Sequence, residues 1–476
     1  MTAPGWLRSP AGVRWLGFAG SVCAATDAVL FGAPVWIRRG VSVMSILRGP
    51  NGVLIMLLWI AGLAALCAAW WYGRRLSVSR RWILVTAALW IAPMLLVPPL
   101  ASRDMYAYAC QGSLFDAGFN PSVVGVSAQP CPWLESVSVV WRDTPTPYGP
   151  LWIILTGLAA SWGSQAVALG IFRAYAVLAV LMLAVVVPAL ARRTGASQER
   201  ALWLVLCCPL VPVHFVGGGH NDALTIALLL GGLTLIVGRR PLGSLVAGGA
   251  LVGAAIAVKT TVGVVLPFAA LLAAGGLCLS RPGMLRFLRR GGAVVGGAAA
   301  MLVALSAGSG LGFGWAVALS GAGESRSWTS PPTAVGIAVN AVGKVLGVRI
   351  DVVPAVRTVA LILLLIVLVA IWWRFRRGDA LHGAALACLS VIFFAPITQP
   401  WYLFWALALF AAGAVRARWL EITVVASMFL ILPNGDGAWK PLQVPFAFLV
   451  TGLAGWVVWR SWRWWREPVP VEGAPA

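Results

Sequence analysis

The chain has 476 residues, of which 60% are hydrophobic and only 10% are charged. A soluble globular protein carries about 25% charged residues, so this composition excludes a water-soluble enzyme and a secreted domain. Lys and Arg number 35 against 14 Asp and Glu, but these basic residues cluster between apolar runs, which is typical of the cytoplasmic loops of a membrane protein rather than of a nucleic-acid-binding protein.

Apolar runs long enough to cross a bilayer as helices recur along the whole chain. We expect about fourteen spanning helices, each needing roughly 20 residues. Their ranges are 13–32, 51–73, 82–100, 165–190, 201–216, 222–238, 242–258, 261–279, 291–309, 353–373, 381–398, 402–415, 419–432 and 442–460. Several runs are short, so two or three broken or re-entrant helices are expected, with 148–163 as a further partial segment. The predicted fold class is an all-α integral membrane protein, a polytopic helical bundle with a single domain over 1–460 and a cytoplasmic tail over 461–476.

The basic clusters give this map an orientation. Most of them fall on one side, which the positive-inside rule makes cytoplasmic. They are Arg8 and Arg14, Arg74 to Arg81, Arg192 to Arg200, Arg239 and Arg240, Arg281 to Arg290, Arg374 to Arg377, Arg416 and Arg418, and Arg460 to Arg466. The first apolar run lacks a small-residue cleavage site, so we expect a retained first helix and both termini in the cytoplasm. Four tryptophans near the C-terminus are expected to anchor the last helix at the interface: Trp459, Trp462, Trp464 and Trp465.

The polar loops without basic clusters all fall on the opposite face, where we expect the chemistry. They are 101–148, 217–222, 259–261, 310–352, 398–402 and 433–441. Within spans, Asp27 and Arg173 are charged, and each is expected to snorkel to the outer surface. Cys110 and Cys131 share the first loop and could pair if that face is oxidising.

The first outer loop, 101–163, opens on the sequence Ser-Arg-Asp-Met-Tyr-Ala-Tyr-Ala-Cys-Gln-Gly from Ser102. Asp104 follows the end of a span closely, where partial desolvation and the charge of Arg103 compete in setting its pKa. Two interpretations stand: Asp104 is a functional carboxylate, or it caps a short helix on which Tyr108 and Gln111 follow at helical spacing.

The second motif is Gly-Gly-Gly-His-Asn-Asp over 217–222. Its glycines let the backbone approach a ligand or a neighbouring helix closely, and Asp222 would cap the next helix. A tight turn between helices is the alternative, because the pattern of a phosphate-binding loop is absent. His220 lies beside an acidic residue, which favours a functional role for the motif. Three histidines in the whole chain cannot build a His-rich metal site, so we expect no metal.

Two further motifs lie at the outer ends of spans. Lys259 precedes two threonines, and a buried cation there would need an anionic partner, either Asp222 or a ligand phosphate. The alternative is a lysine that snorkels to the interface. Trp401 and Tyr402, in Thr-Gln-Pro-Trp-Tyr, belong either to the interfacial aromatic belt or to a stacking platform for a sugar. The chain has no DxD pair, no HExxH and no dinucleotide fingerprint, so we expect no cofactor.

Taken in order, S-R-D-x-Y-x-Y-x-x-Q-G, Y-G-P at 148–150, G-G-G-H-N-D, V-K-T-T at 258–261 and Q-P-W-Y at 399–402 resemble the actinobacterial polyprenol-phosphomannose-dependent α-(1→6)-mannosyltransferases. The resemblance covers about residues 80 to 460 and implies a GT-C fold, in which an acidic residue of the first outer loop is the base. By motif match that residue is Asp104. The resemblance also implies an inverting transfer of mannose from polyprenyl-phosphate-mannose to a mannolipid acceptor of the lipomannan core, outside the cytoplasm.

These motifs give a set of expected site residues. Asp104 is the expected base, Lys259 with His220 or Arg103 the phosphate partners, and Trp401 and Tyr402 the sugar or lipid contacts. The remaining expected substrate-binding residues are Tyr106, Gln111, Tyr148, Asn221 and Asp222. Two other functions stay open: a lipid-linked sugar flippase or secondary transporter, and a structural partner in a cell-wall assembly complex. Convergence of Asp104, Asp222 and Lys259 on one cavity would favour the enzyme.

Overall fold

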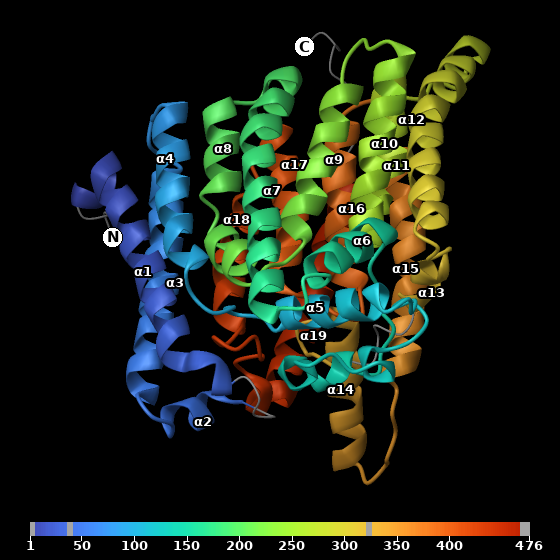
Figure 1. The fold of residues 1–476 in the computed structure, drawn as a ribbon. Helices are drawn as coiled ribbons and strands as arrows, with labels where there is room; N and C mark the ends of the chain where they lie inside the picture. The colour runs from blue at the N-terminus through green and yellow to red at the C-terminus, as the bar shows by residue number, and fades with distance from the viewer. Residues whose placement is uncertain (1–4, 36–40, 320–325, 467–476) are drawn as a thin grey trace.

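The computed structural model describes residues 5–35, 41–319 and 326–466, and the described part is helical throughout with one isolated bridge between Ile431 and Gly437 (Figure 1). The tail 467–476 and the side chains of Trp462, Trp464 and Trp465 lie outside the described residues. Long helices run side by side, and the expected polar loops gather at one end of the bundle (Figure 1).

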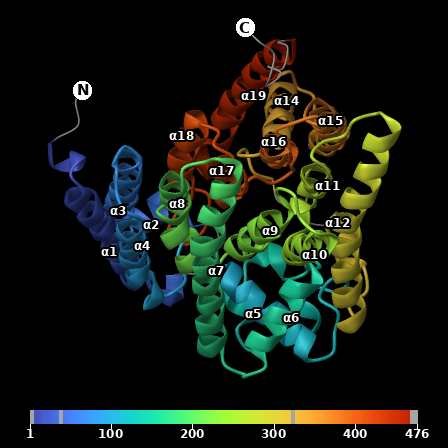
Figure 2. The ribbon, with the colours of Figure 1, turned by 90° about the horizontal axis from the view of Figure 1, so that it is seen from above.

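An N-terminal group of helices stands to one side of the bundle when it is viewed along the helices (Figure 2). It comprises α1 (Pro10–Val35), α2 (Val43–Leu47), α3 (Gly52–Gly73) and α4 (Arg80–Ile91). Helices α1 and α3 cross at Gly20 and Gly62. Their backbones are so close there that a Cβ on Gly20 would lie 2.7 Å from the carbonyl oxygen of Gly62. Small residues at such a crossing let two apolar helices approach closely inside a bilayer.

The central group continues the chain through α7 to α12. Its members are α7 (Gln165–Thr194), α8 (Gln198–Leu206), a π-helical segment (Val211–Gly217), α9 (Asp222–Ile236), α10 (Leu242–Val258), a 3₁₀ segment (Thr260–Val265), α11 (Leu266–Ala274) and α12 (Arg281–Gly308). Helix α9 packs between α7 and α10 and is buried along most of its length, so apolar residues surround it on all sides.

The C-terminal group follows α12 in the chain. It comprises α13 (Gly314–Ala318), α14 (Pro331–Val345), α15 (Val353–Arg374), α16 (Ala380–Phe394), a 3₁₀ turn (Pro400–Tyr402), α17 (Leu403–Ala412), α18 (Arg418–Ser427) and α19 (Gln443–Arg466). All of its helices except α13 lie behind the central group in the view of Figure 1. Helix α14 lies within a segment expected to be a loop. Ser330 caps it and Pro331 opens it, and one face packs on α15 and α19, so the local helix signals were present in the sequence.

The described residues include five helices long and apolar enough to cross a membrane, or six if a bent pair counts as one span. The five ranges are Gly52–Gly73, Gln165–Thr194, Arg281–Gly308, Val353–Arg374 and Lys440–Ser461, and the pair Gln198–Leu206 and Val211–Gly217 bends by 57°. Every predicted run contains helix, but many of these helices have only 10–17 residues. At 1.5 Å per residue such helices are shorter than a bilayer core unless adjoining segments extend them, so the count of fourteen stays a prediction.

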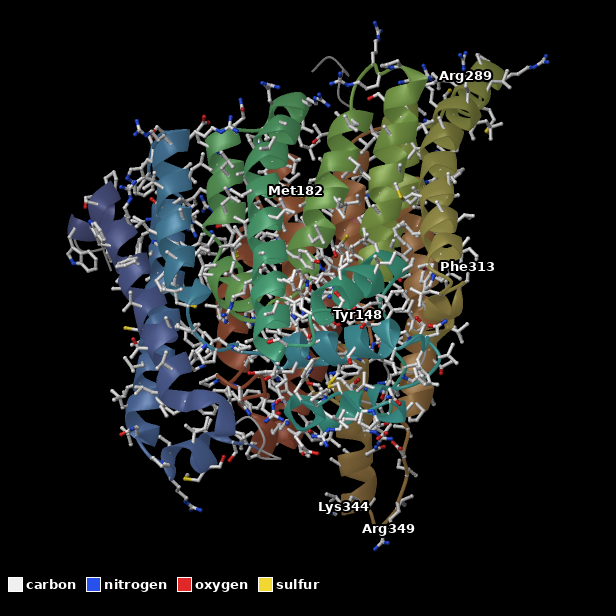
Figure 3. The ribbon with its side chains drawn as sticks, viewed as in Figure 1. Tyr148, Met182, Arg289, Phe313, Lys344 and Arg349 are labelled. Carbon is white, nitrogen blue, oxygen red and sulfur yellow. A yellow bond between two sulfur atoms is a disulfide. The ribbon has the colours of Figure 1, made fainter. Side chains whose placement is uncertain are left out.

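The expected segregation of charge has a structural counterpart. The connection between α7 and α8 and the start of α12, with Arg289, lie at the upper end in Figure 3, whereas Lys344 and Arg349 of the α14–α15 connection lie at the lower end. We call these the basic end and the loop end. Arg173 reaches the carbonyl oxygens of Leu95 and Val97 near the loop end. The expectation for Asp27 is wrong: it is fully buried in α1, because neighbouring helices cover it before it reaches a surface.

Candidate functional site

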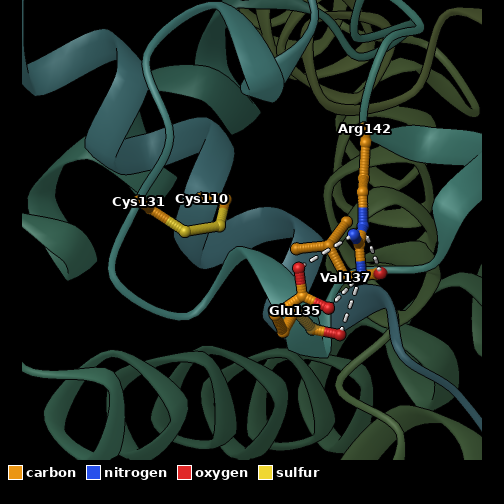
Figure 4. Close-up of a disulfide and its surroundings, with 5 residues drawn as sticks. All are labelled: Cys110, Cys131, Glu135, Val137 and Arg142. Carbon is orange, nitrogen blue, oxygen red and sulfur yellow. Dashed lines mark hydrogen bonds and ion pairs between the residues drawn. A yellow bond between two sulfur atoms is a disulfide. The ribbon is translucent and has the colours of Figure 1, made fainter. Parts of the chain in front are cut away.

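The segment 101–163, which was expected to be the first outer loop, folds onto the bundle as a compact layer. Helices α5 (Asp104–Asp116) and α6 (Pro150–Ala160) pack on each other, and α5 also contacts α7. A disulfide joins Cys110 of α5 to Cys131 of the following loop (Figure 4), and Arg142 pairs there with Glu135 at 3.2 Å. The backbone N–H of Ala101 donates to the carbonyl oxygen of Pro433, which ties the start of this layer to the 433–441 loop. The helix that carries Asp104 is therefore held from several sides.

Asp104 is the first residue of α5, not its cap. Arg103 occupies the N-cap position, so helix capping does not explain the carboxylate of Asp104. One Asp104 oxygen, Oδ2, lies 3.2 Å from Nδ1 of His220 and accepts a long hydrogen bond of 3.5 Å from the hydroxyl of Tyr108. The Asp104 side chain keeps 24% of its surface exposed, so it is only partly covered by its neighbours.

The pKa of Asp104 is set by opposing effects. Burial by itself raises the pKa of this carboxyl, but the hydrogen bond from His220 and the positive charges of His220 and Lys259 outweigh it, so the pKa lies below its usual value. Asp104 is therefore ionised at neutral pH and able to accept a proton.

A second carboxylate lies deeper, in a buried ion pair. Both oxygens of Asp222 accept hydrogen bonds of 2.8 Å from the ammonium of Lys259, and the Trp405 indole N–H donates to Oδ1 at 2.7 Å. The Asp222 side chain is fully buried and that of Lys259 is 11% exposed. Such a pair stays charged in a low dielectric only because each partner compensates the other.

Aromatic rings pack against His220, the partner of Asp104, and against Lys259, the partner of Asp222. Trp401 is buried and stacks on His220 with 3.7 Å between ring centroids, so one face of the indole is occupied by the protein. Tyr402 stacks on Trp405 at 4.8 Å, and the Lys259 ammonium lies 4.5 Å from the centroid of the Tyr402 ring. A cation over an aromatic face gains further stabilisation where it is desolvated.

Two tyrosines lie near both carboxylates. The hydroxyls of Tyr108 and Tyr148 are 3.3 Å apart, and Figure 3 shows Tyr148 above the loop layer, inside the bundle. Burial, together with the negative charges of Asp104 and Asp222, raises the pKa of both phenols well above their usual value. They therefore remain protonated and can donate hydrogen bonds.

Breaks in the helices bring these side chains together. The π-helical segment ends at Gly217, and Gly219 then turns with φ +66°, where a Cβ would lie 2.3 Å from the Met105 side chain. Only glycine fits there, so the motif serves both as a tight turn and as a close approach of His220 to α5. Lys259 has an extended backbone between α10 and the next segment, which frees its side chain to turn toward Asp222.

The other expected site residues lie at the edge of this cluster or outside it. The charge of Arg103 interacts with that of Asp436, in the loop over α5, and Tyr106 lies near Arg103 and Arg173. Gln111 is buried two turns further along α5, with its Oε1 unpaired among the described residues. Asn221 is buried at the start of α9, and neither of its amide atoms has a hydrogen-bond partner within 5–35, 41–319 and 326–466.

Three cluster members were missing from the expected set. Tyr108 and Trp405 follow Asp104 and Trp401 by four residues, the spacing that places two helical side chains on one face, so their signal was present. His214 is fully buried in the π-helical segment, 5.2 Å from the Trp401 ring centroid. It stands in an apolar run, and only the π-helical turn, a feature that often marks functional sites, singles it out.

Comparison with known proteins finds one family. The family model described as α-(1→6)-mannopyranosyltransferase, N-terminal domain, matches residues 14–275, and the MptB C-terminal domain model matches 332–461. The chain is 33% identical to α-(1→6)-mannopyranosyltransferase A of Mycobacterium tuberculosis, over 89% of this chain and 84% of the relative.

Relatives from a second organism agree. The chain is 29% identical to α-(1→6)-mannopyranosyltransferase A of Corynebacterium glutamicum, over 86% of this chain and 88% of the relative. It is 27% identical to α-(1→6)-mannopyranosyltransferase B of the same organism, over 76% and 64%. No solved structure matches the chain. The resemblance read from the sequence motifs is thereby confirmed.

Proposed function

The chain belongs to the α-(1→6)-mannopyranosyltransferase family, and we propose that it transfers mannose from polyprenyl-phosphate-mannose to a growing α-(1→6)-mannan of the lipomannan core at the outer face of the membrane. Its relatives support a glycosyltransferase that acts within a membrane. The proposed donor, acceptor and membrane face are supported mainly by one observation. Asp104, His220, Asp222 and Lys259 converge in one aromatic-lined cluster at the loop end.

In the proposed reaction, Asp104 is the general base. Its Oδ2 takes the proton from an acceptor mannose hydroxyl, whose oxygen attacks C1 of the donor mannose. The bond from C1 to the phosphate oxygen breaks, and polyprenyl phosphate leaves with the electron pair. A single displacement converts a β-linked donor into an α-linked product. It needs one base and positive charge at the phosphate rather than a pair of glycosidase carboxylates.

Charge for the departing phosphate would come from Lys259 and His220. The Lys259 ammonium has three N–H donors, and its two hydrogen bonds to Asp222 leave one donor for a phosphate oxygen. The Nε2 of His220 has no hydrogen-bond partner among the described residues, while Nδ1 faces Asp104. The stacked Trp401 fixes the plane of the imidazole, which makes Trp401 a positioning residue in this proposal.

Two observations support the outer face for this site. The Cys110–Cys131 disulfide lies in the layer that carries Asp104, and disulfides persist in oxidising compartments outside the cytoplasm. The basic clusters lie toward the opposite end, as the positive-inside rule requires of the cytoplasmic side. A lipid phosphate donor suits this face, because nucleotide sugars are made in the cytoplasm.

The decisive assay uses sealed membrane vesicles that contain the protein and radiolabelled polyprenyl-phosphate-mannose. A membrane-impermeant mannoside acceptor added outside right-side-out vesicles should be elongated, and the same acceptor outside inside-out vesicles should not. Elongation only with inside-out vesicles would show that the site faces the cytoplasm. Turnover with GDP-mannose, in protein free of polyprenyl phosphate, would refute the lipid donor. A flippase would move the labelled lipid across the membrane and form no elongated mannoside.

The pH dependence of turnover should reveal the contact between Asp104 and His220. Because the pKa of Asp104 lies below its usual value, the wild-type acid limb of kcat/KM due to this group should lie below the ordinary titration range of an aspartate. His220→Gln removes the effects of His220 that lower this pKa and leaves burial less opposed, so the acid limb should move to higher pH. The carboxylate's contribution to stability, present above the unfolded pKa and lost as pH falls through the folded pKa, should shrink in the same variant.

His382→Gln is the matched control, since His382 Nδ1 also lies 3.2 Å from an aspartate, Asp379, at the start of α16. Its acid limb should coincide with that of the wild type. An unmoved acid limb in His220→Gln would show that His220 does not tune the base.

A further inference from the structure

A second charged cluster lies at the basic end, away from the proposed catalytic site. Glu421, in the first turn of α18, has a side chain only 3% exposed. Arg74, at the end of α3, reaches Glu421 Oε2 at 3.2 Å, and Arg200 of α8 reaches Oε1 at 3.5 Å. The Arg74 guanidinium also lies over the Trp71 ring at 3.3 Å, so it is fixed on two sides.

Positive charge exceeds negative charge around Glu421. Only Arg74 and Arg200 contact Glu421, but the charges of Arg75 and Arg418 also act on Arg74 and oppose the effect of that carboxylate. Arg418 stands at the first position of α18, where the helix dipole disfavours a cation. An anion bound beside these arginines would reduce the repulsion between their charges.

A cavity of about 320 Å³ lies beside the pair, and we call it the Glu421 cavity. Arg74 and Arg200 line it together with the polar Ser77 and Ser197, the apolar Leu76 and Trp203, and one carboxylate, that of Glu199, whose side chain is exposed to solvent. A guanidinium has five donors, and Glu421 is the one side-chain acceptor in contact with either arginine among the described residues, so donors remain for a ligand. The walls therefore offer donors for an anion beside a surface for hydrocarbon.

We propose that the Glu421 cavity binds the phosphate group of an anionic membrane lipid. Two arginines give the fork geometry that recognises phosphate oxygens. The cavity lies where the apolar helices α3 and α8 meet their charged ends, the depth of lipid head groups, and its apolar wall suits the glycerol and upper acyl chains. A free phosphate could pair with the same arginines but would make no contact with the apolar wall. The proposal is independent of the proposed mannosyl transfer.

The test measures binding to purified protein by native mass spectrometry, with short-chain phosphatidylglycerol, phosphatidylcholine and inorganic phosphate as probes. Phosphatidylglycerol should bind at least about tenfold more tightly than the other two. Arg200→Gln should weaken phosphatidylglycerol binding by about tenfold or more, as expected for loss of one charge-assisted hydrogen bond. Arg192→Gln is the matched control, an exposed arginine at the same end of the bundle, and should change binding less than twofold.

Ser77→Trp provides a test that leaves the ion pairs intact. Ser77 is exposed in the connection between α3 and α4, so an indole can enter the cavity without disturbing a helix, and it should abolish binding. Equal affinity for phosphatidylglycerol and phosphatidylcholine, or an equal loss in Arg192→Gln, would overturn the site. Tighter binding of inorganic phosphate than of phosphatidylglycerol would show that the ligand is not a lipid.

Discussion

Asp104→Asn should reduce turnover by a factor of about 10² to 10⁴ and leave the protein folded. Asparagine keeps the size of the side chain and can still hydrogen-bond to His220 and Tyr108, but it cannot accept the acceptor's proton. The fold should tolerate the change, since Asp104 is not the cap of α5 and asparagine keeps its hydrogen bonds, although the charge interactions with His220, Lys259 and the helix dipole are lost. The measurement is kcat with the polyprenyl donor, beside the thermal midpoint of the same preparation.

Asp116→Asn is the matched control, because Asp116 is the last residue of the same helix and is exposed. Its turnover should equal that of the wild type. Near-normal turnover of Asp104→Asn would eliminate Asp104 as the base and leave Asp222 as the other carboxylate of the cluster. Asp222 is poorly suited to that role, since Lys259 and Trp405 already occupy its oxygens and its side chain is fully buried.

The sequence predicted the ingredients of the cluster better than its geometry. Bilayer thickness sets the length of apolar runs, and the positive-inside rule sets where arginines cluster. The helical membrane class and the two unlike ends could therefore be predicted. The polar motifs at the loop end could also be found, because polar residues are costly near hydrocarbon and stand out. The pairing of Lys259 with Asp222 was one of two partners that the cost of a buried cation allows, and the structure forms it.

Other features depend on packing between segments distant in the chain. Trp401 was expected in the interfacial belt or against a sugar, yet it stacks on His220 from a motif 180 residues earlier, and no local pattern reports such a contact. Asp27 was expected at the surface because its distance from the helix end can be counted, whereas its burial depends on neighbouring helices. The number of spans stays a prediction for a related reason, since a short apolar helix can be a broken span or a core segment.

Lys259 should prove necessary for both the fold and the donor, and two variants separate the roles. Lys259→Met leaves Asp222 charged, buried and held by Trp405 alone, which should lower the free energy of unfolding by about 3 to 5 kcal/mol. The double variant Asp222→Asn with Lys259→Met removes both charges and keeps the Trp405 hydrogen bond, so most of that stability should return. Stability is read from denaturant unfolding and donor use from steady-state kinetics.

In the double variant, KM for polyprenyl-phosphate-mannose should still rise, or kcat fall, by about 10-fold or more, because a charge-assisted hydrogen bond to the phosphate is worth about 1.5 to 3 kcal/mol. KM for the acceptor should stay nearly constant. The matched control is the exposed pair Arg326 and Asp351, 2.6 Å apart, whose removal should cost far less stability than the loss of Lys259 and leave donor kinetics unchanged. If the stable double variant used the donor like the wild type, Lys259 would serve only to neutralise Asp222, and the leaving phosphate would depend on His220 and its neighbours for charge.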